Sequence, residues 1–109
     1  MRSSPRLFQY ACRITLFTRQ NCSLCVNAKQ VLSTVWDKHP FVYKEIDVMT
    51  PDAKGWQDLY EFDVPVIHIA KTEHGLERPE LSAKAQKLMH RFSAEQVMEK
   101  MDIISDPKS

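Results

Sequence analysis

The sequence lacks a long apolar run, an internal repeat and a surplus of charge of either sign. None of its apolar stretches approaches the roughly 18 residues that a helix needs to span a bilayer, so we expect no membrane segment. The net charge is only +1, which gives no reason to expect a nucleic-acid partner. The length of 109 residues predicts one domain with a single core.

Cysteine is scarce, and its number is odd. Three cysteines cannot all pair within one chain, which argues against the disulfide framework of a small secreted protein. Cys22 and Cys25 form a Cys-x-x-Cys motif, so we interpret them as a redox-active pair. Cys12 stands at the edge of an apolar run, where we expect a small buried side chain without a redox role.

Carboxylates are absent from residues 1–36. The opening residues 1–13 carry arginine and serine but no acid, which is typical of a mitochondrial transit segment and equally of a solvated arm. They also lack the apolar core of a secretory signal, so we expect a mitochondrial or cytoplasmic protein. The sequence thus predicts an arm over residues 1–13 and one domain over residues 14–105.

The apolar periodicity predicts four strands and three main helices. A helix should follow Cys22 and end before Pro40, because the residue before a proline disfavours helical geometry. A second helix should begin at Thr50 as its cap, and a third at Ser93, which forms a capping box with Gln96. We expect a polar surface excursion over residues 71–86. The expected strands cover residues 14–18, 41–48, 64–70 and 88–92.

The order of these elements is β-α-β-α-β-β-α. The first two strands need a right-handed crossover and must be parallel, whereas the last two are expected to pair as an antiparallel hairpin. The predicted fold class is therefore α/β, with a four-stranded mixed sheet covered by helices on both faces.

The cysteine pair stands where a strand ends and a helix begins. Unpaired N–H groups and the positive end of the helix dipole favour a thiolate there, so Cys22 is expected to attack and Cys25 to resolve the mixed disulfide. Lowering a thiol pKa from about 8.5 to about 6.5 requires about 2.7 kcal/mol of preferential thiolate stabilisation. The helix end supplies about 1–2 kcal/mol of this, and Arg19 is the nearest cation in sequence that can supply the rest.

The order of elements and the motif Cys22-Ser23-Leu24-Cys25 resemble the thioredoxin fold. Within that fold, the run from Thr18 to Cys22 and the run from Asp63 to Val66 are similar to glutaredoxins, and the resemblance extends from Ile14 to Met101. It implies a thiol–disulfide oxidoreductase that functions in electron transport and cell redox homeostasis. It also implies a cis bond at Val64-Pro65, substrate binding by the backbone there, and contact of Arg19 with substrate.

The sequence departs from ordinary glutaredoxins where those proteins hold glutathione. Asp63 replaces a threonine before the Val-Pro pair, and no Gly-Gly turn or acidic helix start follows between Ala70 and Gln96. We therefore expect no bound cofactor, and glutathione is a disfavoured reductant. The expected partners are a disulfide-containing protein or a low-molecular-weight thiol substrate, together with a reductant system. We expect a monomer.

Two other interpretations stay open at this stage. Cys22 and Cys25 could supply half of a zinc or iron–sulfur site, although the four histidines show no ligand spacing and are expected at surface or half-buried positions. The chain could also be a non-catalytic subunit of an assembly that retains the fold.

Trp36, Trp56 and Tyr60 recur at helical spacing and are expected in the core or at its rim.

Overall fold

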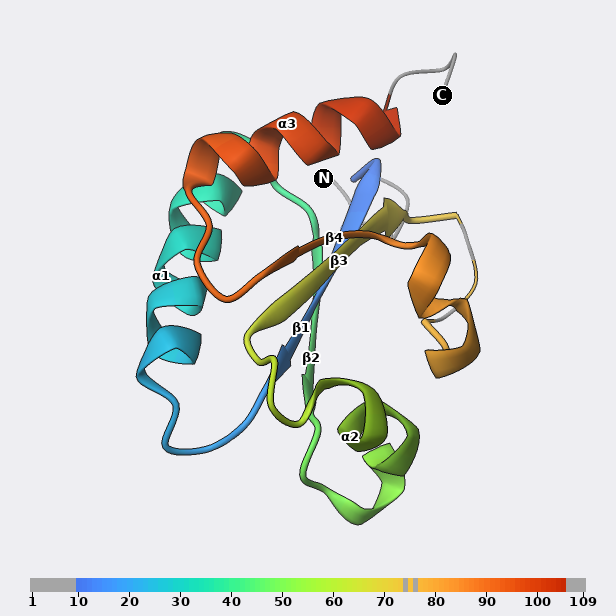
Figure 1. Ribbon diagram of the computed structural model, residues 1–109. Helices are drawn as coiled ribbons and strands as arrows, with labels where there is room; N and C mark the ends of the chain where they lie inside the picture. Colours follow the sequence, from blue (N-terminus) through green and yellow to red (C-terminus); the bar gives the residue numbers. More distant parts are fainter. Residues whose placement is uncertain (1–9, 74, 76, 106–109) are drawn as a thin grey trace, which may run out of the picture.

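A computed structural model of the chain describes residues 10–73, 75 and 77–105. Strands and helices alternate and then end in a hairpin and a helix, and two short 3-10 turns (η2 and η3) accompany them (Figure 1). The elements are β1 (Cys12–Thr18), α1 (Ser23–Lys38), β2 (Val42–Asp47), η2 (Pro51–Ala53), α2 (Lys54–Tyr60), β3 (Val66–Lys71), η3 (Pro79–Lys84), β4 (Gln86–Met89) and α3 (Ala94–Ser105).

The four strands form one mixed sheet in the order β2-β1-β3-β4. Strand β1 pairs in parallel with β2 and antiparallel with β3, and β3 pairs antiparallel with β4. This arrangement confirms the predicted α/β fold. The register places Phe17 opposite Val66, so the segment that enters β3 lies beside the end of β1 from which the chain reaches Cys22.

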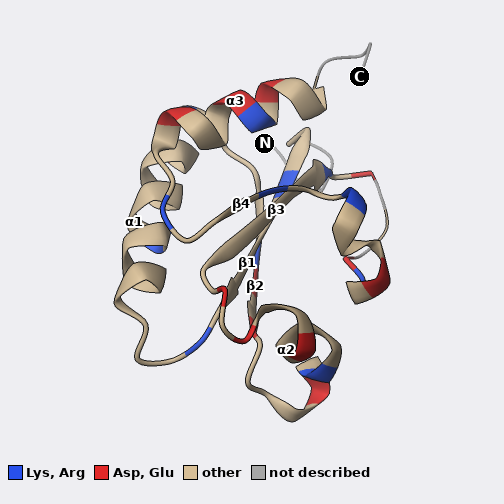
Figure 2. Cartoon of the chain, in the orientation of Figure 1, with Lys and Arg blue, Asp and Glu red and all other residues tan. Residues whose placement is uncertain are grey.

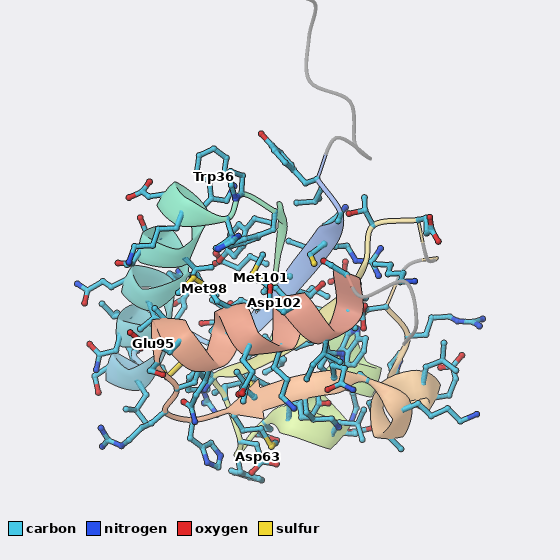
Figure 3. The ribbon with its side chains drawn as sticks, turned by 90° about the horizontal axis from the view of Figure 1, so that it is seen from above. Trp36, Asp63, Glu95, Met98, Met101 and Asp102 are labelled. Atoms are coloured by element: carbon cyan, nitrogen blue, oxygen red, sulfur yellow. A yellow bond between two sulfur atoms is a disulfide. The ribbon has the colours of Figure 1, made fainter. Side chains whose placement is uncertain are left out.

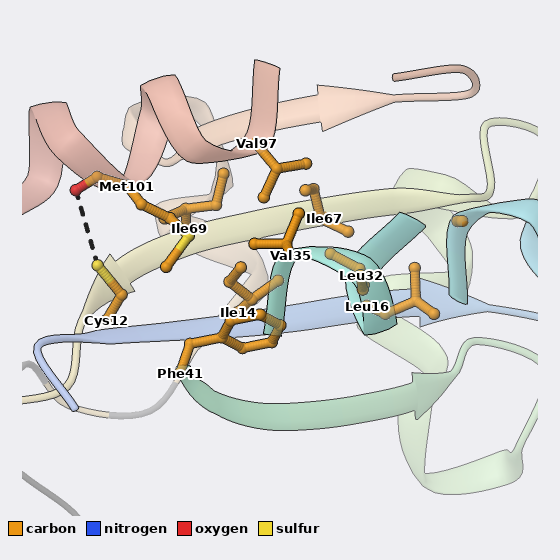
Figure 4. Packing of buried hydrophobic residues seen from close by; sticks show 11 residues of the cluster. Cys12, Ile14, Leu16, Leu32, Val35, Phe41, Ile67, Ile69, Val97 and Met101 are labelled. Atoms are coloured by element: carbon orange, nitrogen blue, oxygen red, sulfur yellow. Dashed lines mark hydrogen bonds between the residues drawn. The ribbon is translucent and has the colours of Figure 1, made fainter. Parts of the chain in front are cut away.

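Helices cover both faces of the sheet. Helices α1 and α3 lie on one face, whereas α2 and η3 lie on the other (Figure 1). The first face buries Ile14, Leu16, Ile67 and Ile69, because side chains two apart on a strand share a face (Figure 4). The opposite face buries an aromatic cluster whose members include Phe17, Trp56 and Tyr60.

The tryptophans divide between core and rim, as the helical spacing predicts. Trp56 is buried beside Phe17, with ring centroids 4.4 Å apart. Trp36 is exposed near the end of α1, where its indole N–H donates a hydrogen bond to the carbonyl of Phe41 (3.0 Å; Figure 3). Trp36 therefore lies at the rim of the core that includes Phe41.

The last strand lies earlier in the chain than the predicted range of 88–92. It covers Gln86–Met89 and ends there because His90 adopts a φ of 63°, in the left-handed region, which a strand cannot continue. The main-chain N–H of His90 instead donates to the carbonyl of Pro65 (2.7 Å). The chain thereby turns toward α3.

One predicted helix start is confirmed with its cap bonds, and another is confirmed in position only. Ser93 Oγ accepts from the N–H of Gln96, and Gln96 Oε1 accepts from the N–H of Ser93, which is the reciprocal capping box. Thr50 stands at the N-cap position of η2 with Pro51 in the first turn, but its hydroxyl donates to the carbonyl of Asp47 (2.9 Å) and makes no cap bond. A 3-10 turn intervenes, and α2 begins at Lys54.

Helix α2 approaches η3 closely at a glycine. A Cβ atom on Gly55 would lie 2.8 Å from Cγ of Pro79, so the absence of a side chain permits this contact.

No helix in the described part of the chain is both long and apolar enough to cross a membrane. The predicted boundary between residues 1–13 and 14–105 stays a prediction. The sequence also predicts that the last helix ends at Asp106-Pro107, and these two residues, like residues 1–9, lie outside the described residues.

Candidate active site around the cysteine pair

Cys22 is the N-cap of α1, and Cys25 lies in the first turn of that helix. Their Cα atoms are 5.2 Å apart and their sulfurs form a disulfide bond. Cys22 has extended backbone angles, and its Sγ accepts a hydrogen bond from the N–H of Cys25 (3.1 Å). Cys25 is buried whereas Cys22 is partly exposed, so the first sulfur is the one that a substrate can approach.

The helix end carries no acid that would oppose a negative charge on Cys22. Helix α1 has 16 residues and no carboxylate in its first turn. Its first N–H groups have no carbonyl partner within the helix, so they and the aligned peptide dipoles present partial positive charge at the N-cap. A thiolate on Cys22 would receive this stabilisation together with the hydrogen bond from Cys25.

Arg19 connects the loop before Cys22 to the segment after α2. Its Nη1 donates a hydrogen bond to the carbonyl of Glu61 (3.2 Å). The guanidinium is therefore anchored rather than freely solvated, and its charge is held beside the loop that leads to the cysteine pair. Its predicted role in substrate binding stays a prediction.

The Val64-Pro65 peptide bond is cis, which confirms that expectation. Pro65 is fully buried, and its carbonyl accepts the N–H of His90. Asp63 is the residue before Val64. Its Oδ1 lies 3.7 Å from Nε2 of His90, and both side chains are about half exposed. Substrate binding by Val64 and Pro65 stays a prediction.

A hollow of about 180 Å³ adjoins the first turns of α1. Apolar side chains from α1 form one wall, and the turn between β4 and α3 forms the other. Its lining residues are Leu24, Asn27, Ala28, Val31, His90, Arg91 and Phe92. The side of this hollow opposite α1 is thus formed in part by a histidine and an arginine.

Cys12 lies at the opposite end of β1 from the pair. It is 2% exposed, and its Sγ lies 3.7 Å from the carbonyl of Met101 and 3.4 Å from Oγ of Ser105 (Figure 4). Burial raises the pKa of this thiol. The six residue steps along β1 span about 20 Å, so Cys12 cannot join Cys22 and Cys25 in one intramolecular site. The prediction of a buried cysteine is confirmed.

The expectation of surface or half-buried histidines is wrong for His68, which is 1% exposed. Its Nε2 lies 2.7 Å from Oη of Tyr60, and its Nδ1 lies 2.8 Å from Oε1 of Glu77. A carboxylate only accepts hydrogen bonds, so Nδ1 donates to Glu77. Arg13 donates to the other oxygen of that carboxylate (2.8 Å) and to the carbonyl of Gly75 (2.9 Å).

Sequence reasoning missed this buried network. The signal available was the alternation of side chains on two strands. Arg13 and His68 occupy positions that face away from the core under α1 and α3, whereas the apolar residues next to them in each strand face that core. The partner, Glu77, comes from the excursion over residues 71–86, and no local pattern specifies that long-range pairing. The hydrogen bond from His68, ahead of that from Arg13, lowers the pKa of Glu77 against the opposing effect of burial.

A metal site has no obvious donor set in the described part of the chain. There, no three side chains of His, Cys, Asp or Glu gather in a way that could hold a metal ion.

Several solved structures resemble this chain in fold. Protein XcR50 from X. campestris is 20% identical, with a TM-score of 0.58 over 83% of this chain and 96% of that one. Protein Ne2328 from Nitrosomonas europaea is 18% identical, with a TM-score of 0.57 over 91% and 95%. A mutant thioredoxin from Halobacterium salinarum NRC-1 is 12% identical, with a TM-score of 0.63 over 91% and 79%. These likenesses show the thioredoxin fold.

The family comparison covers nearly all of the folded chain. A family model described as glutaredoxin-like domain (DUF836) matches residues 13–102. This range contains both cysteines of the pair, the cis proline and all of the sheet except Cys12. The resemblance inferred from the sequence motifs is confirmed, and the chain belongs to the glutaredoxin-like domain (DUF836) family.

Proposed function

We propose that the protein is a thiol–disulfide oxidoreductase in which Cys22 is the nucleophile and Cys25 is the resolving thiol. The proposal rests mainly on one observation: the N–H of Cys25 donates a hydrogen bond to Cys22 Sγ at the start of helix α1. The first turn of this helix contains no acidic residue. A thiolate is the reactive form in disulfide exchange, and this position favours it. The family and the fold are consistent with this kind of chemistry.

The reaction has two exchange steps. The Cys22 thiolate attacks one sulfur of a substrate disulfide, a mixed disulfide forms, and the other substrate sulfur departs as a thiolate. Cys25 then loses its proton and attacks Cys22 Sγ, which releases the second substrate thiolate and leaves the Cys22–Cys25 disulfide. Two electrons pass from the protein to the substrate. The Cα separation of 5.2 Å is within the usual range for a disulfide, so ring closure needs no large backbone movement.

An external thiol must then reduce the Cys22–Cys25 disulfide. Glutathione is the disfavoured reductant, because Asp63 places a carboxylate two residues before the cis proline and its charge opposes an anionic tripeptide. A protein disulfide is the preferred substrate class, and a low-molecular-weight thiol is the second. The further proposals are a monomer with no bound cofactor, at work in the mitochondrion or the cytoplasm in electron transport and cell redox homeostasis.

The test uses three single substitutions and a peptide disulfide as probe. We expect Cys22→Ser to abolish turnover with any donor, and Cys25→Ser to accumulate a covalent adduct on Cys22 whose mass increases by one peptide. Cys12→Ser is the matched control and should retain wild-type turnover. Full activity of Cys22→Ser would contradict the proposal. Full activity of Cys25→Ser with glutathione would show a monothiol mechanism and remove the role of Cys25.

The alternative of a zinc or iron–sulfur site is tested on the same protein. Anaerobically purified wild type should contain no stoichiometric zinc or iron and should show no visible absorbance from a cluster. One metal ion or cluster for every one or two chains, lost in Cys22→Ser, would favour the metal-binding interpretation. The assembly-subunit interpretation predicts that the wild type fails to reduce any disulfide.

A further inference from the structure

Phe62 is the most exposed large apolar side chain in the described part of the chain. It is 88% exposed, in the turn that follows α2. Leu59 is three residues earlier and 41% exposed, and Glu61 between them keeps helical backbone angles. Residues three apart on a helical backbone share a side, so Leu59 and Phe62 form one small apolar projection.

The turn that carries Phe62 is held from both sides. The N–H of Asp63 donates to the carbonyl of Tyr60 (2.9 Å), and Arg19 donates to the carbonyl of Glu61 (3.2 Å). His90 lies 3.7 Å from the Asp63 carboxylate. The backbone that carries the Phe62 ring is therefore held by hydrogen bonds. A partner that binds the ring loses little free energy in ordering the turn.

This turn adjoins the redox site. Arg19 is three residues before Cys22, and Asp63 is two residues before the cis proline. The loop from β1 to α1 and the turn from α2 to β3 leave the sheet at the same end (Figure 1). A macromolecule whose disulfide reaches Cys22 therefore approaches the end of the sheet at which the turn with Phe62 lies.

The two residues that flank Phe62 in the chain, Glu61 and Asp63, are acidic. Asp58, one turn earlier on α2, is paired with Lys54 over 2.6 Å, and Figure 2 shows both signs of charge on this helix. In the view of Figure 3, Asp63 lies at the opposite edge of the molecule from Trp36, so this acidic rim is separate from the exposed indole. Carboxylates around an apolar anchor favour a partner with basic residues.

We propose that Phe62, supported by Leu59, is the docking residue for a protein substrate that presents an apolar side chain flanked by basic residues next to its disulfide. This inference rests on the proposed thiol–disulfide exchange and specifies the substrate class. Aromatic side chains dominate such anchors because a single ring buries a large apolar area. Glutathione offers neither an apolar side chain nor a net positive charge, which agrees with its disfavoured position as a reductant.

The test compares two synthetic peptide disulfides that differ only beside the cysteine. One peptide carries phenylalanine and lysine, the other serine and lysine, and both release thionitrobenzoate when Cys22 of the reduced protein attacks. In a single turnover of the reduced wild type, we expect the second-order rate constant for the first peptide to be about tenfold larger, equivalent to about 1.4 kcal/mol. Phe62→Ala should lower this ratio to near one.

The matched control is Leu81→Ala. Leu81 is 44% exposed on η3, outside the turn that carries Phe62, and its loss should leave the peptide preference unchanged. A wild type with no preference, or a preference that survives Phe62→Ala, would overturn the docking proposal while leaving thiol–disulfide exchange intact. A wild type that reacts with neither peptide would overturn the proposed function itself.

Discussion

The main-chain N–H of Cys25 donates a hydrogen bond to Sγ of Cys22 over 3.1 Å. Within a Cys-x-x-Cys motif, this bond requires that the first cysteine cap the helix and the second lie in its first turn, as the chain does here. The bond is strongest when the acceptor sulfur is charged, because hydrogen bonds to ionised groups are roughly twice as strong as neutral ones. Helix geometry and thiol chemistry are thereby coupled in these two residues.

We predict that the pKa of the Cys22 thiol in the reduced protein is lower than that of an ordinary cysteine. The rate of iodoacetamide uptake should rise with pH around a midpoint below the value of about 8.5 for an unperturbed thiol. Mass spectrometry of the alkylated peptide identifies the residue, and Cys25→Ser isolates its titration. A midpoint at or above 8.5 would show that the helix end does not activate Cys22.

Arg19 should contribute to this activation through its charge. Arg19→Met removes the cation and its hydrogen bond to Glu61, so the pKa of Cys22 is expected to rise by less than about one unit, since charge pairs near the surface contribute about 0.2–1 kcal/mol. Arg19→Lys keeps the charge and should retain most of the effect. Equal midpoints for wild type and Arg19→Met would exclude an electrostatic role.

Cys12 should resist alkylation in the folded protein. Its thiol is buried and its pKa is raised by that burial, so both access and thiolate fraction are low at neutral pH. Reduced native protein treated with iodoacetamide at pH 7.4 should leave Cys12 unmodified, whereas addition of urea should expose it. Rapid native labelling of Cys12 would contradict the position of its sulfur against Met101 and Ser105.

Glu77→Gln should destabilise the protein strongly. The carboxylate accepts hydrogen bonds from His68 and Arg13, whose side chains are 1% and 7% exposed, and removing one partner of a buried pair costs about 3 kcal/mol. Urea unfolding followed by circular dichroism measures the loss. The matched control is Glu80→Gln, an exposed position whose change should stay within about 0.5 kcal/mol.

The same carboxylate predicts how stability depends on pH. Because the pKa of Glu77 is lowered in the folded state, its contribution is fully present above the unfolded value of about 4.3 and is lost as pH falls through the folded value. The difference in unfolding free energy between wild type and Glu77→Gln should therefore shrink below about pH 4. A difference that grows on acidification would contradict the assignment.

Ser93→Ala should remove the side-chain cap of α3. The Ser93 hydroxyl accepts the N–H of Gln96, and loss of an N-cap oxygen costs about 1 kcal/mol. Thermal unfolding should show a lower Tm, whereas Thr50→Ala should have a smaller effect because Thr50 makes no cap bond. Equal losses for the two variants would show that the capping geometry is not the cause.

Local patterns determined the elements that carry their own signals. Helix α1 was predictable from the apolar spacing after Cys22 and from Pro40, and the start of α3 was predictable from the Ser93–Gln96 box. The mixed sheet followed from element order, because a crossover connection imposes parallel pairing and a short return imposes antiparallel pairing. These inferences need only the chemistry of neighbouring residues.

Positions that depend on distant partners were not predictable in this way. Strand β4 ends at Met89 because the N–H of His90 donates to the carbonyl of Pro65. These two residues are too far apart in the sequence for a local pattern to contain both. Local propensity is a weak preference there, and one tertiary hydrogen bond outweighs it.

The sequence by itself determined where the cysteine pair stands, because a strand, a helix start and two cysteines within four residues are all local features. Only the tertiary structure decided what surrounds it. It brought Arg19 to the carbonyl of Glu61, placed Phe62 on an anchored turn, and buried His68 against Glu77. These contacts join residues far apart in the chain, and their energies arise only when the folded sheet excludes water from both partners.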